Sequence, residues 1–136
     1  MLATLLLSAA VNAAPIPFDA TQLAGSWAES VNTGSVCEEA RHFSRMQLSD
    51  DRQRLAIFND RTWKSTLGTT NRFAAVVLAE TERSLTIRYD NETRRDPSGK
   101  LVEWQLIIVA PGVYRWREAD WAEGKVNGVV GIRCSP

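Results

Sequence analysis

The sequence of 136 residues predicts an all-β fold, an up-and-down antiparallel β-barrel of about eight strands preceded by a short helical turn. The first observation is that short runs of strand-forming residues recur at even spacing, with turn residues such as Gly, Pro, Asn and Asp between them. The second is that no amphipathic helix longer than about two turns interrupts these runs. Because closure removes exposed strand edges, a barrel is the most economical arrangement for strands linked in succession by hairpins.

The N-terminal segment has the composition of a secretory signal peptide. Residues 1–13 carry no charged side chain, contain an apolar run at Leu5–Leu7, and have the small residues Val11 and Ala13 near their end. The apolar run is too short to span a bilayer as an anchor. We therefore expect cleavage after Ala13 and a secreted or periplasmic product with no integral membrane segment.

The remaining chain divides into an N-terminal arm with a short helical turn, residues 14–24, and a single β-barrel domain, residues 25–136. The helical turn is expected at 19–23, directly before Gly25. A chain of this length can bury one hydrophobic core but not two. The predicted strands cover residues 25–31, 40–48, 54–60, 61–67, 72–80, 84–92, 101–110, 113–121 and 129–135.

Alternation of apolar and polar residues predicts inward and outward strand faces. In the run SLTIRYD, Leu85, Ile87 and Tyr89 share one face and the intervening polar residues share the other. The run VYRWRE repeats the pattern, with its two aromatic residues opposite its arginines. The run LIIVA at 106–110 is instead apolar on both faces, which predicts that a helix, a loop or a partner covers its outer side.

Charge excludes one class of partner. The sequence holds 16 Lys and Arg residues against 16 Asp and Glu residues, so its formal net charge at pH 7 is zero. Binding to nucleic acid needs a basic surplus, and the sequence also lacks a polybasic run that would attract it to a membrane surface. We therefore expect no nucleic-acid partner.

Cys37 and Cys134 are the only cysteines, and two cysteines in an exported chain most simply form one disulfide. The bridge would join the first and last parts of the domain. Closing a loop of that length would stabilise the fold by about 4 to 5 kcal/mol on the chain-entropy model. We expect a structural bond with no redox role.

A Gly-x-Trp sequence, Gly25-Ser26-Trp27, opens the first predicted strand, after the helical turn and before the strand meander. In this position it resembles the lipocalins and the wider calycin superfamily. The resemblance implies that Trp27 closes the narrow end of the barrel, that Gly25 lets the chain pass close beneath it, and that Arg133 lies against the indole. The alternative is that Trp27 is an ordinary core residue of a β domain.

The same arrangement constrains the disulfide. If Arg133 packs on Trp27, the last strand runs beside the first, and Cys134 lies near the start of the first strand. A Cys37 that begins the second strand would then be about two strand spacings away, roughly 9.6 Å, which exceeds the limit of roughly 7 Å between bridged Cα atoms. We therefore expect Cys37 in a bent loop, residues 32–39, folded over the end of the barrel.

The sequence contains no recognisable catalytic or metal-binding motif. His42 is the only histidine, and no spacing of His, Cys or Asp matches a zinc site. No nucleophile-elbow or oxyanion motif is present, so we expect neither enzymatic activity nor a cofactor or metal. Glu118 and Asp120 stand two apart on one predicted strand, where we expect a solvated rim, with an inward position beside a polar ligand as the alternative.

Aromatic residues on predicted strands are the candidates for the wall of an apolar pocket, although a filled core would use the same residues. They are Phe43, Phe58, Trp63, Phe73, Tyr89, Trp104, Tyr114 and Trp116. We accordingly expect a protein that binds a small apolar or amphipathic molecule inside the barrel. The alternative is an inhibitor of a hydrolase, such as a protease or lysozyme, that inserts the proline-stiffened arm 14–18 into a cleft. An isomerase-like or cyclase-like barrel enzyme ranks third.

Overall fold

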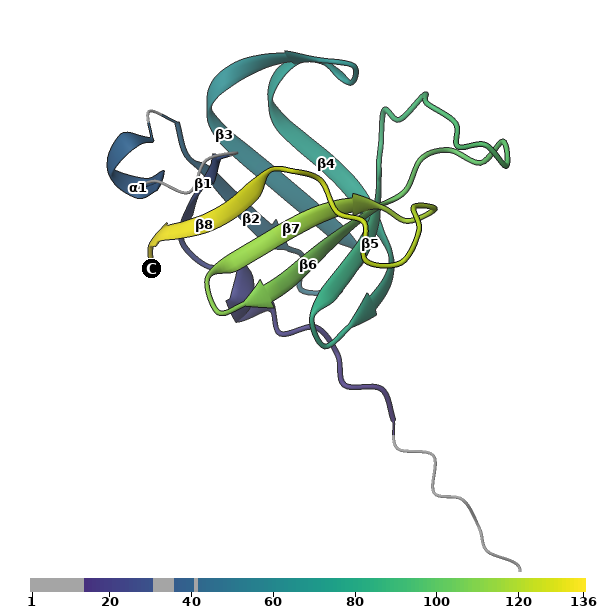
Figure 1. Cartoon of the computed structure of the whole chain (residues 1–136), viewed down its shortest axis with the longest axis horizontal. Coiled ribbons are helices and arrows are strands. Elements are labelled where there is room, and N and C mark those ends of the chain that lie inside the picture. Colours follow the sequence, from purple (N-terminus) through teal and green to yellow (C-terminus); the bar gives the residue numbers. More distant parts are fainter. Residues whose placement is uncertain (1–13, 31–35, 41) are drawn as a thin grey trace, which may run out of the picture.

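The computed structural model describes residues 14–30, 36–40 and 42–136. Eight strands, each paired with the next in sequence order, close into an antiparallel barrel, which confirms the predicted fold class (Figure 1). A 3-10 helix, η1 (Ala20–Leu23), precedes the barrel, and a four-residue helix, α1 (Val36–Glu39), follows the first strand. Among the described residues, neither helix is long and apolar enough to cross a membrane. The strands are β1 (Ser26–Ser30), β2 (Ser44–Leu48), β3 (Arg54–Ser65), β4 (Gly68–Thr81), β5 (Ser84–Tyr89), β6 (Trp104–Ala110), β7 (Val113–Glu118) and β8 (Val130–Ser135).

The barrel closes where the last strand meets the first. β8 runs antiparallel to β1, with Ala28 opposite Ile132. On its other side, β1 pairs with β2 at a single register position among the described residues, where Trp27 lies opposite Ser44.

β3 and β4 form a long hairpin that reaches beyond the neighbouring strands (Figure 1). The two strands predicted over 54–67 are one strand, because β3 continues through an irregularity in register between Phe58 and Trp63. Ser65 pairs with Gly68, so the turn between the strands holds two residues and comes earlier than the sequence suggested. Gly68 adopts a φ of 110°, a conformation that glycine accepts at little cost.

Side chains alternate between the interior and the outer surface of the barrel. Leu85 and Ile87 on β5 are fully buried, and Leu106 and Ile108 on β6 are buried beside them. The intervening residues face outward, as a strand period of two requires. The sequence predicted that a helix, a loop or a partner covers the outer side of the run at 106–110. Val109 is 46 % exposed, so no described part of the chain covers it.

The N-terminal arm and η1 pack the closed end of the barrel. Phe18 and Leu23 are buried and belong to the same core cluster as Trp27. Arg52, in the loop between β2 and β3, donates a hydrogen bond of 2.5 Å to the backbone oxygen of Phe18. The same guanidinium also bonds both carboxylate oxygens of Glu80 on β4. From Phe18 onward, the arm is therefore part of the folded barrel.

Candidate functional site

The floor of the barrel is built around Trp27. Its side chain is fully buried, and its Nε1 donates a hydrogen bond of 2.9 Å to the backbone oxygen of Leu23 at the end of η1. Arg133 is its register partner on β8, and the guanidinium carbon lies 5.0 Å from the centre of the indole. Arg133 also donates to the backbone oxygen of Gln22 at 2.5 Å. These contacts link the indole, the guanidinium and the backbone of η1 at one end of the barrel.

Gly25 allows the two ends of the chain to approach each other closely. Its φ is 97°, which side chains other than glycine rarely adopt. A Cβ atom at this position would lie 1.9 Å from the backbone oxygen of Ser135, far inside van der Waals contact. Both the backbone conformation and the neighbouring strand therefore exclude a side chain at Gly25.

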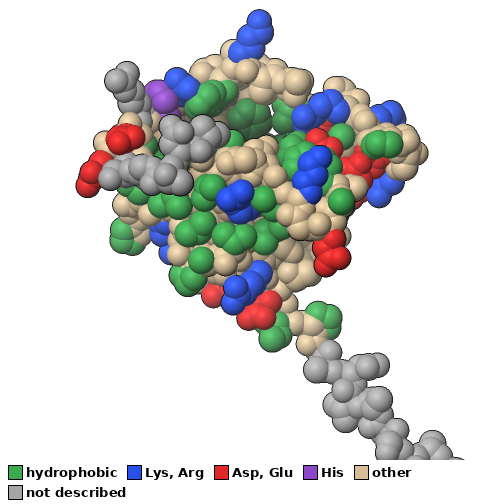
Figure 2. Space-filling model, in the orientation of Figure 1, with side chains coloured by type: hydrophobic (Ala, Val, Ile, Leu, Met, Phe, Trp, Pro, Cys, Tyr) green, Lys and Arg blue, Asp and Glu red, His purple; other side chains and the backbone are tan. Residues whose placement is uncertain are grey.

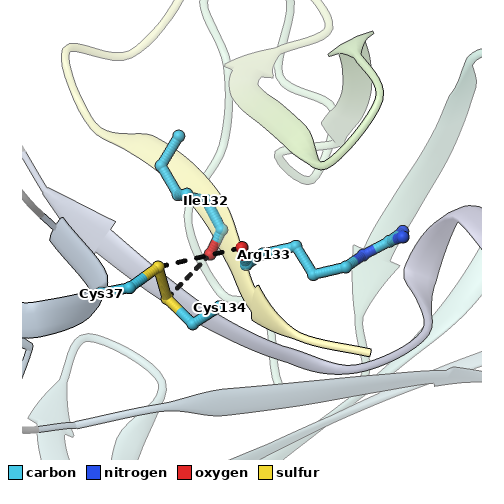
Figure 3. The surroundings of a disulfide bond; sticks show 4 residues. All are labelled: Cys37, Ile132, Arg133 and Cys134. Carbon is cyan, nitrogen blue, oxygen red and sulfur yellow. Dashed lines mark hydrogen bonds between the residues drawn. A yellow bond between two sulfur atoms is a disulfide. The ribbon is translucent and has the colours of Figure 1, made fainter.

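Cys37 and Cys134 form a disulfide within the chain, with Cα atoms 5.3 Å apart (Figure 3). Cys134 follows Arg133 on β8, so their side chains leave the strand on opposite faces (Figure 3). Cys37 reaches the outer face of β8 from α1, which is the described part of the loop predicted over 32–39. The remainder of that predicted loop lies outside the described residues. The bridge thus fastens α1 beside β8 and leaves the barrel interior free.

The barrel is hollow only in part, because a core cluster fills the rest of its interior. A cavity of about 530 Å³ lies beneath the tip of the β3–β4 hairpin, and Figure 2 shows apolar side chains recessed there. This volume lies within the range of roughly 300 to 1,000 Å³ that is typical of ligand sites. The aromatic residues of its wall come from the strands and from the segment before β2. They are Trp27, Phe43, Trp63, Phe73, Tyr89, Trp104 and Trp116.

Six of the eight aromatic residues expected in a pocket wall line this cavity, and two do not. Phe58 lies on the opposite strand face from Ile57, and its ring packs against the guanidinium of Arg72, with the guanidinium carbon 4.7 Å from the ring centre. Tyr114 is only 2 % exposed and packs in the core, with its ring centre 5.0 Å from that of Trp27. The prediction of the pocket wall is wrong at these two positions. Phe58 faces away from the barrel interior, and Tyr114 is packed in the core and does not line the cavity.

Tyr114 nevertheless shapes the cavity by holding a carboxylate. Its ring crosses β8 over Gly131, where a Cβ atom would lie 2.1 Å from the ring. Its hydroxyl donates a hydrogen bond of 2.6 Å to Oε1 of Glu29, which lines the cavity from β1. Burial and the negative charge of Glu29 raise the pKa of Tyr114, so the phenol stays protonated and acts as the donor.

An ion pair in the loop between β5 and β6 brings Arg94 to the cavity wall. Nε and Nη2 of Arg94 each donate a 2.8 Å hydrogen bond to the carboxylate of Glu92, whose side chain is fully buried. Burial alone would raise the pKa of Glu92, but the hydrogen bonds from Arg94 hold it below its ordinary value. The guanidinium carbon of Arg94 lies 5.7 Å from the ring centre of Trp104. Sequence analysis missed this pair, because nothing distinguishes it from the other charges of that loop.

His42 and Trp63 lie at the more exposed part of the cavity wall. Nδ1 of His42 is 3.5 Å from Oδ1 of Asp60, and its ring meets Trp63 edge-on with centres 6.1 Å apart. Arg61 stacks on the same indole, with its guanidinium carbon 3.6 Å from the ring centre. Among the described residues, no group of three or more His, Cys, Asp or Glu side chains could hold a metal ion.

The tip of the β3–β4 hairpin forms the roof of the cavity. Lys64, Ser65, Thr66 and Leu67 all contribute to its lining. Nδ2 of Asn91, just after β5, donates a hydrogen bond to the backbone oxygen of Leu67. This bond connects the hairpin tip to the loop that follows β5.

Glu118 and Asp120 do not share a strand face. β7 ends at Glu118, and Asp120 is exposed in the turn that follows. Glu118 is half-buried, and its charge adds to the effect of Glu92 in raising the pKa of Arg94. Asp120 therefore lies on a solvated rim, whereas the charge of Glu118 acts on Arg94 in the cavity wall.

No family model matches this sequence, and no curated protein or solved structure matches it. Its function is therefore inferred from the geometry of the barrel and its cavity.

Proposed function

We propose that this chain is a calycin-like barrel without enzymatic activity that binds a small apolar or amphipathic molecule. The cavity of about 530 Å³ carries the proposal, because a barrel with a fully packed core would leave no such space. Aromatic side chains in its wall offer a large apolar contact area. Polar groups such as Glu29, Ser44 and Asn59 stand among them and can orient a ligand.

Export to a secreted or periplasmic location is part of the same proposal. The disulfide between Cys37 and Cys134 supports it, because such bonds persist in oxidising compartments. The signal-peptide composition of residues 1–13, which lie outside the described residues, supports it as well. A chain exported in its own host and beginning at Ala14 is the expected product.

Inhibition of a hydrolase is the second candidate, and the exposed arm is the observation that favours it. Ile16 is 63 % exposed and stands between two prolines. Phe18 weighs against insertion of the whole arm, since it is buried in the closed end of the barrel. Native mass spectrometry of the protein from its exporting host separates the two candidates. A bound small molecule supports the ligand carrier, and a bound hydrolase supports the inhibitor.

A cavity-filling variant tests the proposed function. Asn59→Trp places a large side chain into the cavity from β3, whereas Gln47→Trp places the same side chain on the exposed outer face of β2. We expect saturable binding of the neutral fluorescent probe phenylnaphthylamine to the wild type and to Gln47→Trp, and a loss of about tenfold or more in Asn59→Trp. Circular dichroism verifies that both variants fold. Equal affinity in all three proteins, or no saturable binding to the wild type, would contradict the proposal.

A further inference from the structure

We infer that the molecule held in this cavity carries an organic ammonium group, bound by Glu29 beside the rings of Tyr89 and Trp116. The inference rests on the proposed function, because it assigns a chemical class to the ligand of the same cavity. Three observations support it. Glu29 lines the cavity, the arginine of the cavity wall is already paired with a carboxylate, and aromatic rings of the wall interact with the charge of Glu29 or with the residue that holds it.

Glu29 brings a negative charge into the cavity wall. It projects from β1 on the same face as Trp27, two residues further along the strand. Its Oε1 accepts the 2.6 Å hydrogen bond from Tyr114, which orients the carboxylate without neutralising it. Within the described part of the chain, no ion pair involves Glu29. A cationic group in the cavity would therefore supply the opposite charge that Glu29 lacks.

The cationic side chains of the wall are poorly placed to hold an anion. Arg94 is engaged by both carboxylate oxygens of Glu92, so the pair presents no net charge. Lys64 and Glu29 are both exposed, so water and salt screen both charges, but Tyr114 holds Glu29 in place whereas no hydrogen bond or ion pair among the described residues fixes the Lys64 ammonium group. An anionic ligand would thus meet a neutralised arginine and the repulsion of Glu29.

Four of the seven aromatic rings in the cavity wall have no cation of their own. Trp27 and Trp104 each already face a guanidinium carbon, at 5.0 and 5.7 Å from their ring centres. Among the described residues, Phe43, Phe73, Tyr89 and Trp116 have no such partner. Because aromatic faces attract cations, these four rings are available to an ammonium group.

Tyr89 and Trp116 also lie close to the charge of Glu29. After burial, that charge is the largest cause of the raised pKa of Tyr89. Trp116 packs edge-on against Tyr114, the residue that holds Glu29, with ring centres 6.1 Å apart. Tyr89 and Trp116 are therefore the cation-free wall rings that these interactions link to Glu29, and a carboxylate with aromatic rings favours an alkylammonium ion over an anion or a neutral group.

The rest of the wall suits the apolar part of such a ligand. Phe43, Ile57 and Phe73 line the cavity and offer no charge. The ligand class is therefore an amine or quaternary ammonium compound with an apolar or aromatic body. A cavity of about 530 Å³ limits that body to a small molecule.

Three compounds with one carbon skeleton test the inference by isothermal titration calorimetry at pH 7. They are phenylbutylamine, phenylbutyrate and phenylbutanol, which differ in a cationic, an anionic and a neutral head group. We expect the wild-type protein to bind the amine about tenfold or more tighter than the alcohol, and the carboxylate more weakly than both.

Substitutions test whether Glu29 causes the preference for the amine. Glu29→Gln keeps an acceptor for Tyr114 but removes the charge, and we expect it to lose about tenfold in affinity for the amine and much less in affinity for the alcohol. Asp120→Asn is the matched control, because it removes an exposed charge that does not line the cavity. Tyr114→Phe keeps the charge of Glu29 and should retain the preference for the amine.

The outcomes separate this inference from the proposed function. If none of the three compounds binds the wild type, both the cavity-based function and the ammonium inference are overturned. If the alcohol binds and the amine gains no advantage, or the carboxylate binds tightest, the ligand cavity stands and the ammonium inference is overturned. A preference that survives unchanged in Glu29→Gln overturns the assignment to Glu29.

Discussion

Arg133 and Trp27 lie opposite each other in register across β8 and β1, and the guanidinium carbon is 5.0 Å from the centre of the indole. The guanidinium also bonds the backbone of Gln22 in η1, and the indole bonds the backbone of Leu23. One contact therefore links the first strand, the last strand and the N-terminal helix. We therefore expect the stability of this end of the barrel to depend on the pair.

Arg133→Ala should destabilise the barrel by about 2 to 4 kcal/mol, because it removes both a buried cation–π contact and a charge-assisted hydrogen bond. Arg133→Lys keeps the charge but loses the planar stack, so it should cost less than the alanine variant. Urea unfolding measures the difference. Arg45→Ala, on the exposed outer face of β2, should change stability by no more than about 0.5 kcal/mol. Equal effects at the two arginines would show that the contact with Trp27 is unimportant.

Gly25→Ala should cost about 3 kcal/mol or more, because the new Cβ atom would clash with Ser135 as well as strain the backbone. Gly99→Ala provides the control, since Gly99 also has a positive φ, 86°, but no atom stands within 4 Å of its Cβ position. That variant should lose only about 1 to 2 kcal/mol from the backbone conformation. Chemical denaturation of both variants gives the comparison, and a loss at Gly25 no larger than at Gly99 contradicts the close approach.

Replacing Cys37 and Cys134 together by serine should lower the free energy of unfolding by about 4 to 5 kcal/mol, since the bridge closes a loop of nearly the whole domain. The bridge lies outside the barrel, so the folded variant should still bind phenylnaphthylamine. Thermal unfolding and a probe titration below the melting temperature test the two parts. Loss of probe binding while the barrel remains folded would place the bridge in the site, contrary to the structure.

Glu92 should give the barrel a marked sensitivity to acid. Its folded pKa is depressed, so its contribution is fully present above its unfolded pKa of about 4.3 and is lost as the pH falls through the lower folded value. At pH 7 we expect Glu92→Gln to cost about 1 to 3 kcal/mol, because it leaves Arg94 without its charged partner. The difference from the wild type should shrink below the unfolded pKa.

Asp90→Asn is the control for this pH dependence. Asp90 also has a lowered pKa from its hydrogen bond with Arg54, but both side chains are nearly half exposed. Solvent screening should therefore keep the cost of this substitution below about 1 kcal/mol. Urea unfolding across acidic pH gives both curves, and a Glu92→Gln difference that persists unchanged in acid would exclude the Glu92–Arg94 pair as its source.

The strand order could be predicted from the sequence, because turn residues recur between runs of the right length. The polar pair Asp60-Arg61 interrupted one run, and sequence alone could not show that β3 continues past it. Its continuation depends on pairing with β4, a non-local contact. The position of Cys37 could be confined to a loop by strand spacing, but the helix α1 that carries it was not evident.

Part of the candidate site was predictable from the sequence, because alternation along a strand decides which side chains face the barrel interior. Phe58 shares its strand face with the exposed Arg54, and this signal in the sequence marks it as outward. Tyr114 has the inward parity of Trp116, but it fills the core because register places Gly131 opposite its ring. The pairing of Glu92 with its arginine depends on an irregular loop, for which no periodic pattern exists.

The most direct measurement asks whether the space beyond Trp27 takes up a small molecule. The five tryptophan Nε1–H resonances of the nitrogen-labelled protein can be followed by NMR during titration with phenylbutanol. We predict saturable shifts that are largest at Trp63, Trp104 and Trp116, which line the cavity, and smaller at Trp121, which does not. Unchanged resonances at saturating phenylbutanol, or shifts confined to Trp121, would contradict a ligand-binding barrel.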